Sequence, residues 1–209
     1  MSAFRTVPLG LAAGLVLPID LRRNKKLMLG LYEIEISRHV RRFARRGYKT
    51  FDVGGQSGYY ALTFARLTDS NVISFDCDPD SCTEMEMAFA HNRALGRRIS
   101  VICKYVGEQS SATDVSLDDI AFSQRGFVPD VVKMDIEGAE YRALLGARRI
   151  LRERRPHLII ETHSPEVDAE CRRLLVGVGY TPTVVEPRRW LPDYRPTPFN
   201  RWLIAEGHW

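Results

Sequence analysis

The sequence predicts an α/β fold with a mostly parallel sheet that helices cover on both faces. Strand-like apolar runs alternate with helix-like stretches from about residue 48 to residue 176. The fourth of these runs, VPDVVKMD, has successive apolar residues, as expected for a strand buried on both faces. Two further strand-like runs then follow without a helix between them. They predict an antiparallel hairpin that closes the sheet.

The five expected parallel strands are, in order, KTFDV, NVISFD, ISVICKYV, VPDVVKMD and HLIIET. The expected helices are GYYALTFARL, residues 81–95, residues 139–151 and residues 166–176. In the third helix, apolar residues recur at spacings of three and four, and Pro156 ends the segment. The closing hairpin consists of GYTPTVVEP and NRWLIAE.

The length and composition predict a single domain rather than several domains. A chain of 209 residues with 44% hydrophobic residues can bury its own core. We expect an N-terminal arm and helix at residues 1–47, a core at 48–164, and a C-terminal helix and hairpin at 165–209. The apolar run after Arg5 is too short to cross a membrane, so it predicts an extended arm or hairpin.

The net charge bears on possible binding partners, and the cysteines bear on the cellular compartment. The balance of 30 basic and 26 acidic residues gives a net charge of +4, which does not predict a nucleic-acid partner. The four cysteines are spaced too irregularly for a zinc site. We therefore expect reduced thiols in a cytoplasmic protein.

The stretch FDVGGQSGYY, residues 51–60, is the first candidate binding site. It has three glycines directly after the first strand, where α/β sheets usually contact their ligands. Asp52 lies at the end of that strand. Asp76 ends the second strand, where a carboxylate can bind both hydroxyls of a ribose.

The details of this loop favour S-adenosylmethionine over a dinucleotide. Gln56 occupies the position of the second glycine in the dinucleotide pattern, which argues against NAD. A carboxylate before the glycines disfavours a phosphate and suits an ammonium group. S-adenosylmethionine carries an ammonium, a sulfonium and a ribose but no phosphate. A dehydrogenase is kept as a further alternative.

Ionisable residues follow the fourth and fifth strands. KMDIEGAE places Asp135 and Glu137 just before a helix, whose N-terminal dipole favours carboxylates. Glu140 is expected to cap that helix. The fifth strand ends in Glu161, Thr162, His163 and Ser164. Strand alternation puts Glu161 and His163 on the same side, where both can face one substrate.

The chain resembles the FkbM-type methyltransferases, a family of class I S-adenosylmethionine-dependent methyltransferases. The resemblance rests on LGLYE, FDVGGQSGYYAL, VISFDCDPD, the Asn92 region, SLDDI, DVVKMDIEGAEYRALLGA and RPHLIIETHS. The KMDIEGAE segment followed by LLGA is the most specific of these. Gly55 and Gln56 replace the commoner alanine and asparagine of the family, and Cys77 replaces a proline.

The resemblance implies a three-layer Rossmann-like fold with a seven-stranded sheet, in which residues 48–164 bind the cofactor. It implies that the methionine part and the ribose of S-adenosylmethionine contact Asp52, Gly54, Gly55, Gln56, Ser57 and Gly58. Asp76 would hold the ribose hydroxyls. Val106 and Gly107 would line the adenine pocket, and Asp135 would face the methionine end.

The expected reaction is O-methylation of a small-molecule hydroxyl, on a sugar or another natural product. Asp135 and Glu137 would orient the hydroxyl, and His163 or one of these carboxylates would accept its proton. A divalent metal bound by Asp135, Glu137 and His163 is left open. The segment RRWLPDYRPTPFN, with Trp190 and Tyr194, is expected to form part of a lid over the acceptor.

Two other functions remain as alternatives. The basic run RHVRRFARRG would suit an RNA methyltransferase, although an amphipathic helix with a solvated face explains the same pattern. A non-catalytic module that binds S-adenosylmethionine is the second alternative. The sequence indicates neither an oligomeric state nor a membrane partner.

Overall fold

The computed structural model describes residues 3–22, 24–124, 126–188 and 199–207. Trp190 and Tyr194, which the sequence assigns to a lid, lie outside these residues. The chain divides into two compact units, Met1–Cys103 and Lys104–Trp209, which are described separately below. The single domain expected from the length stays a prediction.

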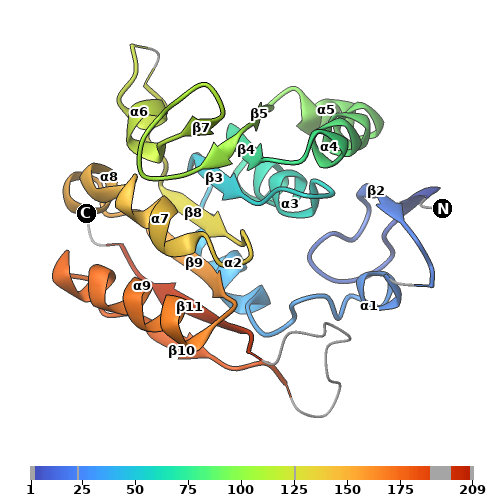
Figure 1. Cartoon of the computed structure of the whole chain (residues 1–209). Coiled ribbons are helices and arrows are strands. Elements are labelled where there is room, and N and C mark those ends of the chain that lie inside the picture. Colours follow the sequence, from blue (N-terminus) through green and yellow to red (C-terminus); the bar gives the residue numbers. More distant parts are fainter. Residues whose placement is uncertain (1–2, 23, 125, 189–198, 208–209) are drawn as a thin grey trace. The chain divides into compact units, whose positions relative to one another are not determined.

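The first unit contains a hairpin, three parallel strands and five helices among its described residues (Figure 1). The strands are β1 (Ala3–Thr6), β2 (Val16–Ile19), β3 (Thr50–Val53), β4 (Val72–Asp76) and β5 (Ile99–Cys103). The helices are α1 (Lys25–Met28), α2 (Ser37–Phe43), α3 (Tyr59–Thr68), α4 (Pro79–His91) and α5 (Arg93–Gly96). Strands β1 and β2 pair antiparallel, which confirms the hairpin predicted for the N-terminal arm.

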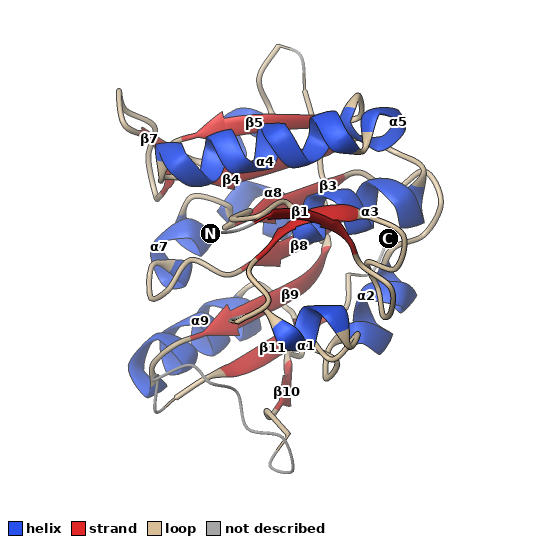
Figure 2. Cartoon of the chain, turned by 90° about the vertical axis from the view of Figure 1, so that its right-hand side faces the viewer, coloured by secondary structure: helices blue, strands red, loops and turns tan. Residues whose placement is uncertain are grey.

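Strands β3, β4 and β5 pair in that order, all parallel. All four residues of β3 are buried, including the polar Thr50 and Asp52. The rings of Phe51 and Phe75 from neighbouring strands meet edge to face, with centroids 5.2 Å apart. Helix α4 runs beside β4 and β5 in both views (Figures 1 and 2). This packing fixes the loops that follow β3 and β4.

The second unit holds the remaining sheet strands. Its strands are β6 (Tyr105–Val106), β7 (Asp114–Val115), β8 (Val131–Met134), β9 (His157–Thr162), β10 (Thr183–Val185) and β11 (Arg201–Ala205). Its helices are α6 (Leu117–Ala121), α7 (Glu140–Leu145), α8 (Arg148–Glu153) and α9 (Pro165–Gly177). Helix α9 lies beside β9 (Figure 2).

The strand directions confirm the predicted mixed sheet. In the second unit the order is β10-β11-β9-β8, with β8 and β9 parallel and β11 antiparallel to both of its neighbours. The two units together supply the seven sheet strands that the family resemblance implied. The antiparallel pair is the C-terminal hairpin, as predicted. Strands β8 and β9 are buried throughout, because the sheet is covered on both faces.

The prediction of one continuous helix over residues 139–151 is wrong in one respect. The segment forms two helices, α7 and α8. The break lies at Gly146, where a side chain would stand 2.1 Å from the carbonyl oxygen of Gly107. The carboxylate of Asp118 accepts hydrogen bonds from the backbone N–H groups of Arg149 and Ile150, each 2.9 Å long. Asp118 thus caps α8 from a distant segment, which the local apolar period did not reveal.

The expectation of four reduced thiols is also wrong. Cys82 on α4 and Cys103 at the end of β5 form a disulfide, with Cα atoms 6.0 Å apart. The pairing arises because α4 packs along β5, a contact that the spacing of the cysteines does not encode. Cys77 and Cys171 are free thiols, the first exposed and the second buried.

The basic run of residues 38–47 belongs largely to α2. Val40 and Phe43 are buried, whereas Arg41 and Arg42 on the same helix are exposed. The amphipathic-helix interpretation of this run is therefore confirmed. Across the described residues, no helix combines the length and the hydrophobicity needed to traverse a bilayer.

Candidate active site

The glycine-rich loop of the first unit follows β3 and turns sharply into α3. The backbone N–H groups of Gly54 and Gly55 both donate to the carbonyl oxygen of Phe75, at 2.8 and 2.9 Å. Gly54, Gln56 and Gly58 have φ angles of 89°, 47° and 77°, in the left-handed region. Glycine adopts this conformation without strain, so the loop sequence and the loop shape agree.

Asp76 joins this loop to the end of β4. One carboxylate oxygen accepts a 2.8 Å hydrogen bond from the backbone N–H of Gln56, and the other accepts a 3.0 Å bond from the N–H of Asp78. Each oxygen keeps a further lone pair for another donor. Because Asp76 is partly exposed, its carboxylate is available to a pair of ligand hydroxyls such as those of a ribose.

The other predicted cofactor residues of the loop divide into an exposed edge and a buried base. Gln56 is exposed, and Gly54 and Ser57 are partly exposed. Gly55 and Gly58 are buried, and a side chain at Gly55 would lie 2.1 Å from Oγ of Ser74. Asp52 is completely buried and accepts a 3.0 Å hydrogen bond from Ser74.

Among the predicted cofactor residues of the first unit, Gly54, Gln56, Ser57 and Asp76 are at least partly exposed, and their cofactor contacts stay predictions. The buried position of Asp52 places its carboxylate beneath the loop, where it interacts with Ser74. A side chain at position 55 would clash with Ser74 and Met85, so glycine fits this position. The cofactor contacts predicted for Asp52, Gly55 and Gly58 stay predictions.

Val106 and Gly107 lie in the second unit, in the short pairing of β6 with β7. Val106 pairs with Val115, and the N–H of Gly107 donates to the carbonyl oxygen of Val115 at 3.0 Å. Both residues are buried. Their predicted place beside an adenine stays a prediction.

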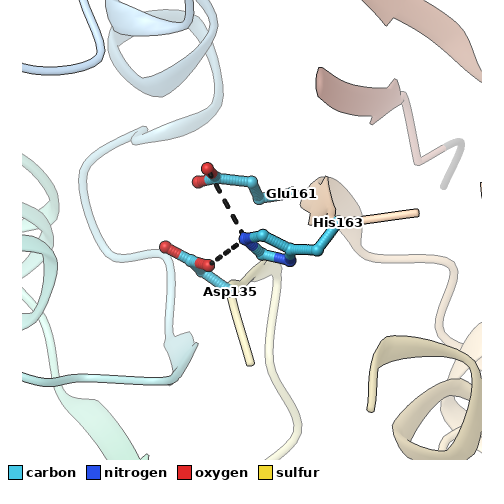
Figure 3. A group of neighbouring side chains, drawn as sticks. All are labelled: Asp135, Glu161 and His163. Carbon is cyan, nitrogen blue, oxygen red and sulfur yellow. Dashed lines mark ion pairs between the residues drawn. The ribbon is translucent and has the colours of Figure 1, made fainter. Parts of the chain in front are cut away.

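Three ionisable side chains converge in the second unit, at the carboxyl ends of β8 and β9. Nε2 of His163 lies 3.3 Å from Oδ1 of Asp135 and 3.8 Å from Oε1 of Glu161. Figure 3 shows both carboxylates directed at this one ring nitrogen. Asp135 and His163 are two of the predicted catalytic residues. The predicted convergence of Glu161 with His163 is confirmed.

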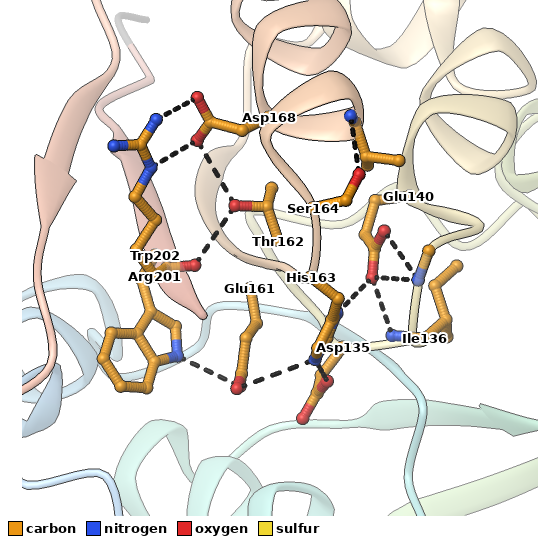
Figure 4. Close-up of polar contacts among 12 residues, drawn as sticks. Asp135, Ile136, Glu140, Glu161, Thr162, His163, Ser164, Asp168, Arg201 and Trp202 are labelled. Atoms are coloured by element: carbon orange, nitrogen blue, oxygen red, sulfur yellow. Dashed lines mark hydrogen bonds and ion pairs between the residues drawn. The ribbon is translucent and has the colours of Figure 1, made fainter. Parts of the chain in front are cut away.

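The far atom of each of these side chains is also held, and Figure 4 shows this for His163 and Glu161. Nδ1 of His163 lies 3.0 Å from Oε1 of Glu140, and the indole N–H of Trp202 donates to Oε2 of Glu161 at 3.1 Å. The ammonium of Lys133 lies 3.3 Å from Oδ2 of Asp135. The orientation of all three side chains is thus fixed by neighbours.

The electrostatics of the cluster favour a positive charge on His163. Burial acts to lower the pKa of His163, but the carboxylates of Asp135 and Glu140 outweigh it and raise the pKa to about 10. At neutral pH the imidazole is therefore protonated. Asp135, with 16% of its side chain exposed, is more accessible than the fully buried side chains of Glu161 and Glu140.

Glu137 lies outside this cluster. It is exposed and has a φ angle of 48°, in the turn that precedes α7. That turn allows the backbone N–H of Gly138 to donate to both oxygens of Glu140, at 3.0 Å each. These bonds hold the turn before α7, and within the described residues no side chain caps the first N–H groups of the helix, so the capping role expected of Glu140 is wrong. The catalytic role of Glu137 stays a prediction.

Sequence reasoning missed the contacts of Glu140, Lys133 and Trp202 with the cluster. Glu140 was assigned only a capping role, although its carboxylate faces His163. The signal for Lys133 was its position in the middle of a buried strand, where a charged residue needs a partner. Trp202 comes from β11, which pairs antiparallel with β9 and places it opposite Glu161.

Comparison with known proteins agrees with this fold and these motifs. A sequence model described as the methyltransferase FkbM domain matches residues 22–195. No curated protein matches the sequence.

Solved structures share the fold. The FkbM methyltransferase from Methylobacillus flagellatus has a TM-score of 0.64 at 20% identity, over 86% of this chain and 52% of that one. This chain therefore spans about half of that protein. The S-adenosylmethionine-dependent O-methyltransferase from Thermotoga maritima has a TM-score of 0.63 at 13% identity, over 92% and 72% of the two chains.

A third structure was solved with the product of the cofactor. TrmK from M. capricolum, in complex with S-adenosyl-homocysteine, has a TM-score of 0.54 at 14% identity, over 81% of this chain and 66% of that one. These likenesses show the Rossmann-like methyltransferase fold. The family match extends over most of the sequence, from before β3 to beyond β10. The chain therefore belongs to the FkbM methyltransferase domain family.

Proposed function

We propose that this protein is an S-adenosylmethionine-dependent O-methyltransferase that acts on a hydroxyl group of a sugar or another small natural product. The observation that carries the proposal is the cluster of Asp135, Glu161 and His163 at the carboxyl ends of β8 and β9. Ligands of open α/β sheets bind at these strand ends. Family membership and the fold shared with a known O-methyltransferase support the same reaction.

The first unit supports the choice of cofactor. Asp76 offers two carboxylate oxygens at the end of β4, and these can accept hydrogen bonds from both hydroxyls of a ribose. The exposed edge of the glycine loop includes Gln56 and Ser57, whose polar side chains can bind the methionine part. Bound S-adenosylmethionine supplies an activated methyl group on a positively charged sulfur.

The reaction consists of one displacement and one proton transfer. The acceptor oxygen forms a bond to the methyl carbon while the bond between that carbon and sulfur breaks, which neutralises the sulfonium. The hydroxyl proton must leave as the new bond forms, so a positioned base accelerates the step. Alignment of the acceptor supplies the remainder of the catalysis.

We assign the proton-accepting role to Asp135. Protonated His163 cannot accept a further proton, whereas Asp135 is the most exposed carboxylate of the cluster. His163 then stabilises the Asp135 carboxylate at 3.3 Å and keeps it in place. Glu137, exposed beside this site, remains a candidate for contacts with the acceptor.

Two measurements test the proposal in sequence. Isothermal titration calorimetry with S-adenosylhomocysteine should show binding by the full chain. Mass spectrometry should then detect S-adenosylhomocysteine and an O-methylated product when S-adenosylmethionine is incubated with a panel of methyl glycosides and polyketide alcohols. Asp135→Asn should abolish product formation and spare binding. Absence of binding refutes the proposal, whereas binding without turnover on any acceptor favours the non-catalytic module.

A further inference from the structure

We infer that Asp135, Glu161 and His163 form a binding site for a first-row divalent cation, for which Mn²⁺ is the representative. The site would lie where the acceptor hydroxyl is expected, so its catalytic meaning rests on the proposed function. Its existence does not, because cation binding is measured without turnover.

The first support is the position of the three ligand atoms. Asp135, Glu161 and His163 each offer one ligand atom, and these three atoms all lie within 4.8 Å of one another. In an octahedral site with bonds of about 2.1 Å, neighbouring ligand atoms are about 3.0 Å apart and opposite ones about 4.2 Å. The observed separations of 3.3 and 3.8 Å from Nε2 fall within that range. Only small side-chain adjustments are needed to place all three atoms on one ion.

The second, independent support is the state of His163. Its side chain is only 9% exposed, and within the described part of the chain its buried Nε2 has no hydrogen-bond partner. Buried ring nitrogens normally have a partner. This atom points at the two carboxylates, as Figure 3 shows, without the alignment of a hydrogen bond. A cation between the three side chains would complete its coordination.

The third support is the set of contacts behind the ligands. Metal-binding histidines usually pair their other ring nitrogen with a carboxylate, which fixes the ring and its tautomer. Here Nδ1 of His163 lies 3.0 Å from the buried carboxylate of Glu140. Trp202 holds the far oxygen of Glu161 (Figure 4). Lys133 holds the far oxygen of Asp135. Each ligand thus presents one atom inward and has its other atom anchored.

The charge of the cluster also matches a divalent ion. The carboxylates of Asp135, Glu140 and Glu161 all contact His163, and the ammonium of Lys133 pairs with Asp135. In the metal-free protein, protonated His163 offsets one of the two remaining negative charges. A divalent cation that replaces this proton would offset both. Buried charges without such compensation are strongly unfavourable.

The donor set indicates the class of ion. Carboxylates suit Mg²⁺ and Mn²⁺, and an imidazole shifts the preference toward first-row transition metals. Mn²⁺ accepts both kinds of ligand and keeps open positions for water or substrate. A cation held here would orient the acceptor hydroxyl and lower its pKa, in place of the weak base that Asp135 alone provides.

The test is a Mn²⁺ titration of the tag-free full chain, which is first treated with EDTA and desalted. Binding is measured as the loss of the EPR signal of free Mn²⁺. We expect one tightly bound Mn²⁺ per chain and a pulsed-EPR coupling to an imidazole nitrogen. Glu161→Gln keeps an oxygen for the Trp202 indole but removes the charge. It should weaken Mn²⁺ binding by at least about tenfold, since even indirect partners of a metal site contribute 10–100-fold.

Glu137→Gln is the matched control, because it removes a carboxylate two positions from Asp135 but outside the cluster. It should leave the Mn²⁺ affinity unchanged. Folded wild-type protein that binds no Mn²⁺ at millimolar concentration, or binds it without the nitrogen coupling, would overturn the inference. Equal weakening by Glu137→Gln would instead favour a site of Asp135, Glu137 and His163.

Calorimetry with S-adenosylhomocysteine in EDTA separates this inference from the proposed function. Cofactor binding without Mn²⁺ binding overturns the cation site and leaves the methyltransferase proposal standing. Mn²⁺ binding without cofactor binding supports the cation site and refutes the methyltransferase proposal. Circular dichroism of each variant confirms that a loss of Mn²⁺ binding does not come from unfolding.

Discussion

Nδ1 of His163 lies 3.0 Å from Oε1 of Glu140. This contact connects the end of β9 to the first residue of α7, two segments separated by 23 positions in the sequence. Glu140 is itself held by the backbone N–H groups of Gly138 and Ile136. The imidazole is therefore oriented by a carboxylate that has no freedom to move away.

The first prediction concerns this pair. In the metal-free protein, Glu140→Gln removes one negative charge beside His163 and keeps the size of the side chain. We expect the pKa of His163 to fall from about 10 by about 1–3 units, because Asp135 still stabilises the charged ring. An NMR titration of the imidazole signals in wild type and variant measures this change. An unchanged pKa would show that Glu140 does not stabilise the charge on His163.

The second prediction separates cofactor binding from catalysis. Asp76→Ala removes the carboxylate that we assign to the ribose hydroxyls, and hydrogen bonds to a charged group contribute about 1.5–3 kcal/mol. Affinity for S-adenosylhomocysteine should therefore fall about tenfold to a hundredfold. His163→Ala should spare this affinity and lower turnover. Calorimetry of both variants checks the assignment, and equal affinities for wild type and Asp76→Ala would refute it.

The third prediction concerns Gly55. A methyl group at this position would lie 2.1 Å from Oγ of Ser74 and 2.5 Å from Sδ of Met85. Because overpacking a buried site costs about 1–3 kcal/mol, Gly55→Ala should lower the melting temperature. Gly177→Ala is the control, since no atom lies within 4 Å of its added methyl group. If both variants melt like wild type, the loop has more room than the structure shows.

The fourth prediction concerns the cysteines. Burial, the main cause, and nearby carboxylates such as Glu140 raise the pKa of Cys171 to about 12, so this thiol stays protonated and unreactive at pH 8. A thiol reagent should therefore modify only exposed Cys77 in the native protein. In denaturant without reductant, Cys77 and Cys171 should both react. Four reactive thiols under that condition would show that Cys82 and Cys103 are not joined.

Much of the fold follows from the sequence because it depends on local patterns. The strand runs, the glycines after β3 and the two strand-like runs near the C-terminus each reflect a short-range property. Apolar periodicity and backbone preference act over a few residues, so they are readable one segment at a time. Asp135 and His163 were located in this way, as polar residues at the ends of buried strands.

The contacts that define the site depended on tertiary structure. Glu161 meets Trp202 because β9 and β11 run antiparallel in a particular register, and no local pattern specifies that register. Glu140 faces His163 and the turn before α7 rather than capping its own helix. The sequence by itself thus determined the class of fold and the strand ends that carry polar residues. Only the packing of distant segments decided which of those residues share one charged cluster, because burial and ion pairing depend on neighbours that the chain brings together from far apart.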